Sequence, residues 1–335
     1  MARMLILRSA GIGDVAMLVH VVRALREQYP DLEIVIATKP RMPQLFAGIE
    51  GLEFILIKDF AQLMKDIRAA RIDCCADMRN ELRGKMVRLL LGLRGIPTAR
   101  YRQNYAERRP LLRSRDKQIT WLRSNVLRFC DVFARLGYPV TLPDRVHWTL
   151  PLPEVFGTKE GTWVGFAPFA STQMKVYPEP QRSKLVELLA RRYDKLFLFS
   201  GGGDEQAFCQ EMATRYPNVV PVFKKTDFTG EVSLMAHLDA VVTMDSSAMH
   251  MASLSGAPLV AVWGATHPAM GYSAWGASPA NYVQLDMPCR PCSVYGEGKC
   301  RLGDRPCLKG ITPESVVRRV QDLITSTQNA PVSGQ

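Results

Sequence analysis

The chain has 335 residues, of which 47% are hydrophobic and 22% charged, a balance typical of a soluble globular protein. This length exceeds what one hydrophobic core usually serves, so two domains are expected. No apolar run approaches the roughly 20 residues that a bilayer-spanning helix needs, and the first residues are apolar too briefly for a signal peptide. We therefore expect a cytoplasmic protein.

Positive charge is concentrated in the first half of the chain. Residues 1–150 hold 26 Lys and Arg against 15 Asp and Glu, whereas residues 151–335 hold 17 of each. The stretch 79–128, here called the basic block, holds 14 basic and three acidic residues, which accounts for the net charge of +11. Such a block is typical of a surface that binds nucleic acid, an anionic membrane or a phosphorylated substrate. The alternative is a surface that is only exposed to solvent, but the acidic residues that would balance its positive charge are missing.

Apolar runs alternate with amphipathic segments through the first half. Strands are expected at residues 4–8, 33–37, 54–57 and 73–77, and helices near residues 15–28, 42–47, 60–70, 83–93 and 119–135. Alternation of this kind builds a doubly wound parallel sheet. A Pro-rich stretch at residues 138–153 marks the expected domain boundary.

The same alternation restarts in the second half. Strands are expected at residues 163–167, 196–199, 219–222, 240–244 and 259–263, and helices at 182–192, 204–215, 232–237, 248–254 and from 313 to about 324. The expected fold is thus α/β, with two Rossmann-like, doubly wound domains and a cleft between them. The basic domain spans residues 1–150, the second domain residues 151–325, and a polar tail residues 326–335.

Two glycines and an acid follow the first strand. Gly11 and Gly13 would let a ligand approach the backbone at the carboxyl end of the sheet, and Asp14 comes directly after them. The dinucleotide fingerprint G-x-G-x-x-G is absent because its third glycine is missing. Asp14 is a candidate functional acid; the alternative is a carboxylate that only favours the helix dipole in the first turn.

Residues 240–268 form an expected strand, short helix and second strand. Asp245 and Ser246 are good N-cap residues where the first strand ends and the helix begins. Free N–H groups and the positive end of the helix dipole meet there, which makes a site for an anion. An ordinary capped crossover in a parallel sheet is the alternative.

Four of the eight cysteines are clustered near the end of the chain. They are spaced Cys-x2-Cys-x7-Cys-x6-Cys, at Cys289, Cys292, Cys300 and Cys307. In a reducing compartment such a cluster indicates a structural zinc site more than disulfides. The paired knuckles of a zinc ribbon are missing, however, so unligated thiols in an ordered loop are the alternative.

Three motifs in this order resemble the lipopolysaccharide heptosyltransferase family (ADP-heptose:LPS heptosyltransferases, glycosyltransferase family 9), inverting enzymes of the GT-B fold. The family's small-residue–Leu-Gly-Asp turn is similar to residues 10–14, with Ile12 for Leu. Its phosphate loop, a Ser/Thr pair before Lys-x-Trp-Pro, is similar to residues 171–178, with Tyr177 for Trp. Its Asp-[Ser/Thr]-[Gly/Ser/Ala]-x-x-His-x-Ala signature and Gly-x-Thr-x-Pro are similar to residues 245–252 and 264–268. The Cys-rich segment is also similar to that of many members.

The resemblance implies transfer of a heptose from ADP-heptose to the inner core of lipopolysaccharide, on a Kdo–lipid A or heptosyl acceptor. Asp14 would be the general base and Lys175 would stabilise the leaving ADP, with no metal or other cofactor in catalysis. The expected donor-binding residues are Ser171, Thr172, Asp245, Ser246, Ser247 and His250. For His250 a structural role in packing the helix is the alternative.

The basic block would hold the phosphorylated lipid acceptor while its lipid stays in the membrane. The expected acceptor-binding residues are Gly13, Arg79, Arg108, Arg109 and Arg113, with Arg115 in the same block. The expected partners are therefore the nucleotide-sugar donor, the lipid acceptor and the anionic inner-membrane surface, on whose cytoplasmic side the enzyme would be peripheral.

Other functions are less consistent with the sequence. Nucleic-acid binding is not expected, because base-stacking aromatics are sparse in the basic block and no known module fits. A GT-B transferase for another nucleotide sugar, or an epimerase, is an alternative; an epimerase would use several carboxylates at the anomeric centre, where only Asp14 is an obvious candidate. A non-catalytic sugar-nucleotide-binding protein is a further alternative, against which the intact Asp14 and Lys175 count.

Overall fold

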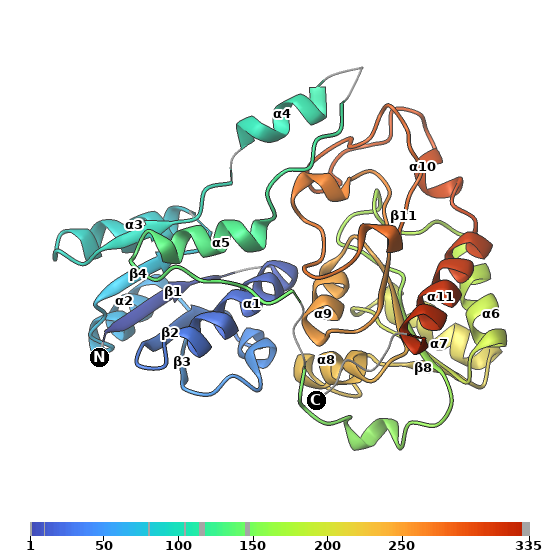
Figure 1. The fold of residues 1–335 in the computed structure, drawn as a ribbon, viewed down its shortest axis with the longest axis horizontal. Helices are drawn as coiled ribbons and strands as arrows, with labels where there is room; N and C mark the ends of the chain where they lie inside the picture. Colours follow the sequence, from blue (N-terminus) through green and yellow to red (C-terminus); the bar gives the residue numbers. More distant parts are fainter. Residues whose placement is uncertain are drawn as a thin grey trace. The chain divides into compact units, whose positions relative to one another are not determined.

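The computed structural model describes residues 2–9, 11–79, 81–103, 105–113, 118–144 and 148–329. The chain forms two compact units (Figure 1). The first comprises Met1–Tyr105 and Arg123–Arg145, and the second comprises Ala106–Leu122 and Val146–Gln335. This division differs from the expected boundary after residue 150 mainly in that Ala106–Leu122, the middle of the basic block, packs with the second unit.

A five-stranded parallel sheet forms the centre of the first unit. Its order is β3-β2-β1-β4-β5, so the chain moves outward from β1 and then crosses back to β4. Ligands of doubly wound sheets bind at such a reversal, beyond the carboxyl ends of the strands. The strands are β1 (Arg3–Leu7), β2 (Glu33–Thr38), β3 (Leu52–Leu56), β4 (Cys74–Asp77) and β5 (Thr98–Arg100).

Helices cover both faces of this sheet. Leu5 and Leu7 of β1 share a buried core with Leu63 of α2 and Val87 of α3. The alternate residues of β1 point to the opposite face, where α1 and α5 contact each other. The helices are α1 (Ile12–Gln28), η1 (Met42–Phe46), α2 (Phe60–Ala69), α3 (Leu82–Gly92) and α5 (Asn125–Ala134).

The second unit contains a six-stranded parallel sheet of the order β11-β10-β9-β6-β7-β8. Here the reversal lies between β6 and β9, at the start of the strand–helix–strand segment described above. The strands are β6 (Trp163–Ala167), β7 (Lys195–Leu198), β8 (Val219–Pro221), β9 (Ala240–Met244), β10 (Leu259–Val262) and β11 (Tyr282–Val283).

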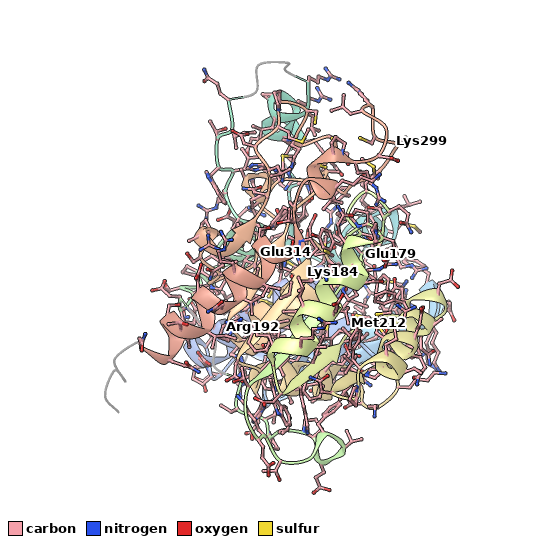
Figure 2. The ribbon with its side chains drawn as sticks, turned by 90° about the vertical axis from the view of Figure 1, so that its right-hand side faces the viewer. Glu179, Lys184, Arg192, Met212, Lys299 and Glu314 are labelled. Carbon is pink, nitrogen blue, oxygen red and sulfur yellow. The ribbon has the colours of Figure 1, made fainter. Side chains whose placement is uncertain are left out.

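The second sheet is also covered on both faces. Residues of α6, α7 and α11 share one core with the strands, and α8 and α9 contact each other. Figure 2 shows α6 toward the viewer, with Lys184 and Arg192 along it. The main helices are α6 (Gln181–Arg192), α7 (Asp204–Arg215), α8 (Phe228–Ala236), α9 (Ser247–Ser255) and α11 (Pro313–Gln328). Shorter elements are η2 (Glu154–Phe156), η3 (Pro268–Met270), η4 (Pro279–Asn281) and α10 (Pro306–Lys309), and α4 (Tyr105–Arg113) begins at the boundary of the units.

The α/β class and the doubly wound sheets are confirmed, and a few elements differ from expectation. The helix expected at 119–135 begins only at Asn125, because the Ser124 hydroxyl accepts from the N–H of Val126 (3.3 Å) and caps it there. The segment at 42–47 is a 3₁₀ helix. α11 continues to Gln328, so the expected tail from residue 326 starts in a helix; residues 330–335 lie outside the described part. No helix among the described residues has the length and apolar character needed to span a bilayer.

Candidate active site

In the first unit, the candidate acid lies in the turn between β1 and α1. Gly11 has a φ of 81°, a left-handed conformation that favours glycine. A Cβ at Gly11 would lie 2.7 Å from Oδ2 of Asp14, so the carboxylate folds back over the start of α1. The Asp14 side chain is nevertheless 39% exposed and is accessible to a substrate. Gly13 lies in the first turn of the same helix, and Ala10 of this motif lies outside the described residues.

Arg8, at the end of β1, fixes Asp14 in this position. Its Nη2 forms an ion pair with Oδ2 of Asp14, and its Nη1 donates a hydrogen bond to the carbonyl oxygen of Met78. The guanidinium also lies over the ring of Phe129, 5.6 Å from the centroid, and the side chain is only 5% exposed. The sequence analysis missed this contact of Arg8 with Asp14; the signal was a charged residue at the end of an otherwise apolar strand.

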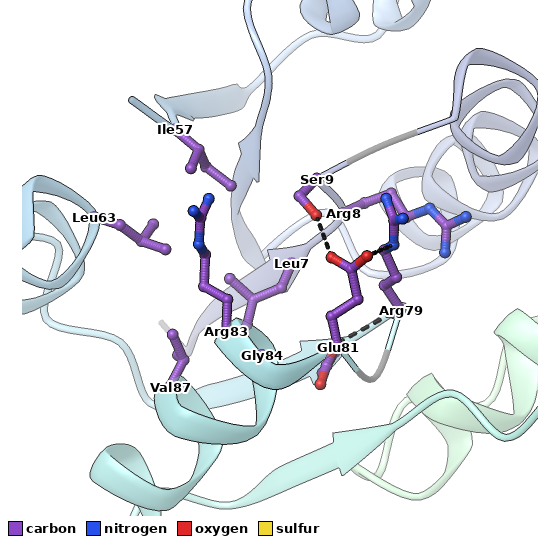
Figure 3. Close-up of a pocket in the computed structure, with 11 residues that line it drawn as sticks. Leu7, Arg8, Ser9, Ile57, Leu63, Arg79, Glu81, Arg83, Gly84 and Val87 are labelled. Atoms are coloured by element: carbon purple, nitrogen blue, oxygen red, sulfur yellow. Dashed lines mark hydrogen bonds and ion pairs between the residues drawn. The ribbon is translucent and has the colours of Figure 1, made fainter. Parts of the chain in front are cut away.

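The end of β4 brings a second charged group beside this turn. Asp77 is buried, forms a 2.9 Å ion pair with Arg88 and accepts from the N–H of Arg79 (3.1 Å). Arg79 pairs with Glu81, whose Oε2 accepts from the Ser9 hydroxyl (3.2 Å; Figure 3). The structure therefore anchors Arg79, an expected acceptor residue, next to the glycine turn.

Two adjoining cavities of the first unit share Ser9, Arg79, Glu81 and Arg83. The smaller, of about 20 Å³, extends toward Leu63 and Val87 (Figure 3). The larger, here called the Arg79 hollow, has about 810 Å³. Its lining combines three apolar side chains with three cations, of which Arg79 is paired with Glu81, and its net positive charge suits an anionic amphiphile. Its full lining is Ser9, Lys39, Phe60, Arg79, Glu81, Leu82, Arg83 and Met86.

In the second unit, three motifs that are distant in sequence converge. Nζ of Lys175 lies 3.5 Å from Oδ2 of Asp245, and both side chains are 11% exposed. The Thr266 hydroxyl donates to the same Oδ2 at 2.6 Å. Tyr177, in the position of the family's Trp, is fully buried and donates to the carbonyl oxygen of Ile311 (2.6 Å). It thereby ties the loop that carries Lys175 to the core.

Beside Lys175, two buried hydroxyls lack a protein partner. Oγ1 of Thr172 and Oγ of Ser246 make no hydrogen bond within the described part of the chain, and an unsatisfied buried hydroxyl costs roughly 1–3 kcal/mol. Ser246 is also the N-cap of α9, and its side chain does not cap the helix. The first N–H groups of a helix have no intrahelical acceptor and carry the positive end of the dipole. Hydroxyls, N–H groups and the Lys175 cation together suit a diphosphate.

The remaining expected donor residues lie around this point. Ser171 is exposed, Ser247 is half-buried as the first residue of α9, and His250 is buried on the same helix. Nearby, burial and then the charge of Arg290 lower the pKa of His267 to about 4. His267 is therefore neutral near pH 7, and its Nδ1 accepts from the N–H of Ala269 (3.1 Å).

The Cys-rich segment packs against this site, which the sequence analysis did not foresee. Gly296 has a φ of 82°, and a Cβ there would lie 2.7 Å from Oγ1 of Thr172 and 2.8 Å from Cγ of Lys175. Arg290 is buried and donates to the carbonyl oxygens of Gly264 and Thr266. Arg290 and Gly296 thus tie this segment to the Gly-x-Thr-x-Pro motif and to Lys175.

The four clustered cysteines differ in their exposure to solvent. Cys292 is exposed, Cys307 is buried, and Cys289 and Cys300 are intermediate. Over the ranges that the structure describes, no three or more His, Cys, Asp and Glu side chains are grouped to hold a metal ion. The zinc site and the alternative of unligated thiols both stay predictions for experiment.

The basic block does not form one surface. Arg108 is 1% exposed; it donates to the carbonyl oxygen of Met270 (3.4 Å) and lies over the ring of Tyr272, 4.7 Å from its centroid. Arg108, which we expected to bind the acceptor, is therefore a buried packing residue of the second unit. Arg109 and Arg113 are exposed on α4, and Arg115 lies outside the described residues.

Comparison with known proteins identifies relatives of this arrangement. A family model described as "Glycosyltransferase family 9 (heptosyltransferase)" matches residues 60–299, which confirms the resemblance seen in the motifs. Lipooligosaccharide heptosyltransferase 2 of Campylobacter jejuni is 27% identical over 136 residues, covering 39% of this chain and 41% of the relative. The protein of that name from Haemophilus influenzae is 30% identical over 175 residues, covering 48% and 47%. The chain thus spans less than half the length of the curated relatives it matches.

Solved structures share the fold over nearly the whole chain. E. coli ADP-heptose LPS heptosyltransferase II has a TM-score of 0.73 at 21% identity, covering 98% of this chain and all of that one. The family 9 glycosyltransferase of Veillonella parvula has a TM-score of 0.72 at 15% identity, covering 97% and 98%. E. coli heptosyltransferase WaaC with ADP has a TM-score of 0.66 at 17% identity, covering 96% and 99%. These likenesses confirm the expected GT-B fold class.

Proposed function

Because the chain belongs to glycosyltransferase family 9, the heptosyltransferases, we propose that it transfers a heptose from ADP-heptose to the inner core of lipopolysaccharide. One observation carries this proposal: Lys175, Asp245 and Thr266 converge beside the open start of α9. The buried hydroxyls of Thr172 and Ser246 have no hydrogen-bond partner among the described residues and are also available to bind an anion. Structurally similar proteins suggest the donor and the acceptor: one is a heptosyltransferase with ADP and another an ADP-heptose LPS heptosyltransferase.

The second unit would stabilise the leaving nucleotide. Negative charge gathers on the diphosphate as its bond to the anomeric carbon breaks, so fixed donors stabilise the transition state more than the ground state. Lys175 provides the cation, and at 3.5 Å from Asp245 its Nζ keeps hydrogen-bonding capacity for a phosphate. Asp245, held by Thr266, orients Lys175. Ser171, Ser247 and His250 would complete the donor contacts.

Asp14 of the first unit would act as the general base. An acceptor hydroxyl attacks the anomeric carbon from the face opposite the diphosphate, gives its proton to the Asp14 carboxylate, and the sugar configuration is inverted. Arg8 holds that carboxylate in one orientation, so less conformational entropy is lost when the reactive geometry is reached. Neither of these proposed steps requires a metal ion.

The Arg79 hollow would bind the phosphorylated acceptor. Lys39, Arg79 and Arg83 lie around it together with the apolar side chains of Phe60, Leu82 and Met86. Cations attract the phosphates, and the apolar wall suits the lipid part of the same molecule. Because that acceptor is anchored in a membrane, we also place the enzyme on the cytoplasmic face of the inner membrane as a peripheral protein. Gly13, Arg109 and Arg113 remain proposed acceptor contacts.

Calorimetry with ADP, UDP and GDP tests the donor part of the proposal. ADP should bind at least about tenfold more tightly than UDP or GDP, a difference of about 1.4 kcal/mol. A transfer assay with ADP-heptose and deacylated, phosphorylated inner-core acceptor tests the reaction itself. Tighter binding of UDP, with no product from ADP-heptose, would favour instead a family 9 enzyme for another nucleotide sugar.

A further inference from the structure

The helix α3 carries an apolar stripe on its outer side. Leu82, Met86 and Leu89 of α3 and Leu93, its C-cap residue, are 74%, 44%, 65% and 77% exposed. At 100° per residue these four side chains fall within an arc of about 60°. We call this set the α3 stripe. Single exposed leucines are common on proteins, but four aligned on one helix make a contiguous patch that indicates an interaction surface.

The α3 stripe is not the face by which α3 packs into its own unit. Val87 and Leu91 are 0% and 1% exposed and belong to the core between α3, α2 and the first sheet. On the helix they lie opposite the stripe. The inner face of α3 therefore provides its packing contacts within the first unit. Folding of this unit does not explain the exposed apolar side chains of the α3 stripe.

Positive charge borders the stripe. Arg83 and Lys85 are exposed on its two sides, Arg94 is exposed just beyond its end, and α3 contains no Asp or Glu. The two acids next to α3 are already paired: Glu81 with Arg79, and the buried Asp77 with Arg88. An apolar stripe between exposed cations is the pattern of a helix that lies in the surface of an anionic bilayer. With 11 residues α3 is too short to span a membrane.

The α3 stripe is continuous with the Arg79 hollow, since Leu82 and Met86 belong to both. If the hollow takes the phosphorylated headgroup of the acceptor, its acyl chains extend to the surface that the stripe covers. We infer that α3 docks the protein on an anionic lipid bilayer, with the stripe among the acyl chains and its cations on the lipid phosphates. The inference rests on the proposed function for the identity of the acceptor, whereas membrane binding itself is tested without it.

Vesicle binding of the full chain tests this inference. The double variant Leu89→Ser/Leu93→Ser removes half of the stripe without touching the lining of the Arg79 hollow. Its partition onto vesicles of phosphatidylglycerol and phosphatidylethanolamine should fall by about tenfold or more, because apolar burial drives interfacial binding. Leu302→Ser is the matched control: Leu302 is 59% exposed in the second unit, and its loss should leave partition unchanged.

A second variant tests how much the positive charges beside the stripe contribute to vesicle binding. Lys85→Gln/Arg94→Gln should weaken binding to anionic vesicles and reduce its salt sensitivity, while neutral phosphatidylcholine vesicles bind both proteins equally weakly. ADP affinity and transfer to a deacylated acceptor should remain at the wild-type level in all of these variants. If wild-type protein fails to transfer heptose to that acceptor but binds vesicles through the stripe, the proposed function fails and the docking inference stands.

Two results would overturn the docking inference. One is equal vesicle partition of the wild type and Leu89→Ser/Leu93→Ser. The other is a dimer by analytical ultracentrifugation that this double variant converts to a monomer with no effect on vesicles, which would assign the stripe to a second copy of the chain. Unchanged melting temperatures would show that the variants are folded, as expected for exposed positions.

Discussion

Asp14 is held by a buried arginine on one side and is accessible to solvent on the other, a combination suited to a base that must meet an incoming hydroxyl. Asp14→Asn keeps the shape of the side chain but cannot take a proton. Turnover should therefore fall by about 10²–10⁴-fold, while ADP affinity measured by calorimetry hardly changes. Asp31→Asn, at an exposed turn of the same unit, is the control. If Asp14→Asn kept more than half of the wild-type activity, Asp14 would be only a carboxylate that favours the dipole at the start of α1.

Arg8 should act on the reaction only through Asp14. Arg8→Gln breaks the ion pair and should lower kcat while the Michaelis constant for ADP-heptose stays nearly constant; Arg8→Lys should recover part of the loss. In the double variant Arg8→Gln/Asp14→Asn the two losses of kcat should not add, because Arg8 has no carboxylate left to position once Asp14 is replaced. Fully additive losses would mean that Arg8 contacts the substrate by itself.

In the proposed mechanism Lys175 contacts the diphosphate, whose negative charge is present in the bound donor and grows in the transition state. Lys175→Ala should therefore weaken ADP binding and slow transfer together, whereas Lys184→Ala, an exposed lysine of α6 (Figure 2), should change neither. A chelator should leave the wild type active. A strict requirement for Mg²⁺ or Mn²⁺ would show that a metal and not Lys175 neutralises the leaving group.

At the scale of elements, apolar periodicity predicted the long strands and helices because these are the segments that bury a face. It failed for β5, α4 and β11, which are very short or, as in α4, carry Pro110 and few apolar residues. The pairing of Asp245 with Thr266 depends on β9 and β10 being neighbours in the sheet. The places of Arg8, Arg290 and Gly296 depend on tertiary contacts that no local pattern encodes.

The Cys-rich segment is the element for which the sequence left two interpretations open, a structural zinc site and unligated thiols. Its four thiols differ in exposure, and among the described residues no three His, Cys, Asp or Glu side chains are grouped to hold a metal ion. We expect purified protein to contain well under one metal per chain by elemental analysis, and stripping with a chelator to leave the melting temperature unchanged. One zinc per chain with tetrahedral sulfur coordination would contradict this.

At the scale of the whole molecule, the excess positive charge is divided between the two units. Arg79 and Arg83 line the hollow of the first unit, while Arg108 is buried in the second and Arg109 and Arg113 are exposed there. Linear sequence cannot show this division, because residues 106–122 leave the unit that their neighbours build. The basic block therefore has at least two roles, and its variants should separate them.

Arg79→Gln/Arg83→Gln should raise the Michaelis constant for a phosphorylated acceptor several-fold and leave ADP affinity unchanged. The salt sensitivity of the remaining activity should also fall, because salt screens the attraction that the variant removes. The Michaelis constant for a dephosphorylated acceptor should change little in this variant. Arg191→Gln/Arg192→Gln, which removes two charges beside α11 of the second unit, is the control. If ADP affinity fell as much as acceptor affinity, Arg79 and Arg83 would be assigned to the donor diphosphate, since a contact with the acceptor alone cannot change the affinity for free ADP.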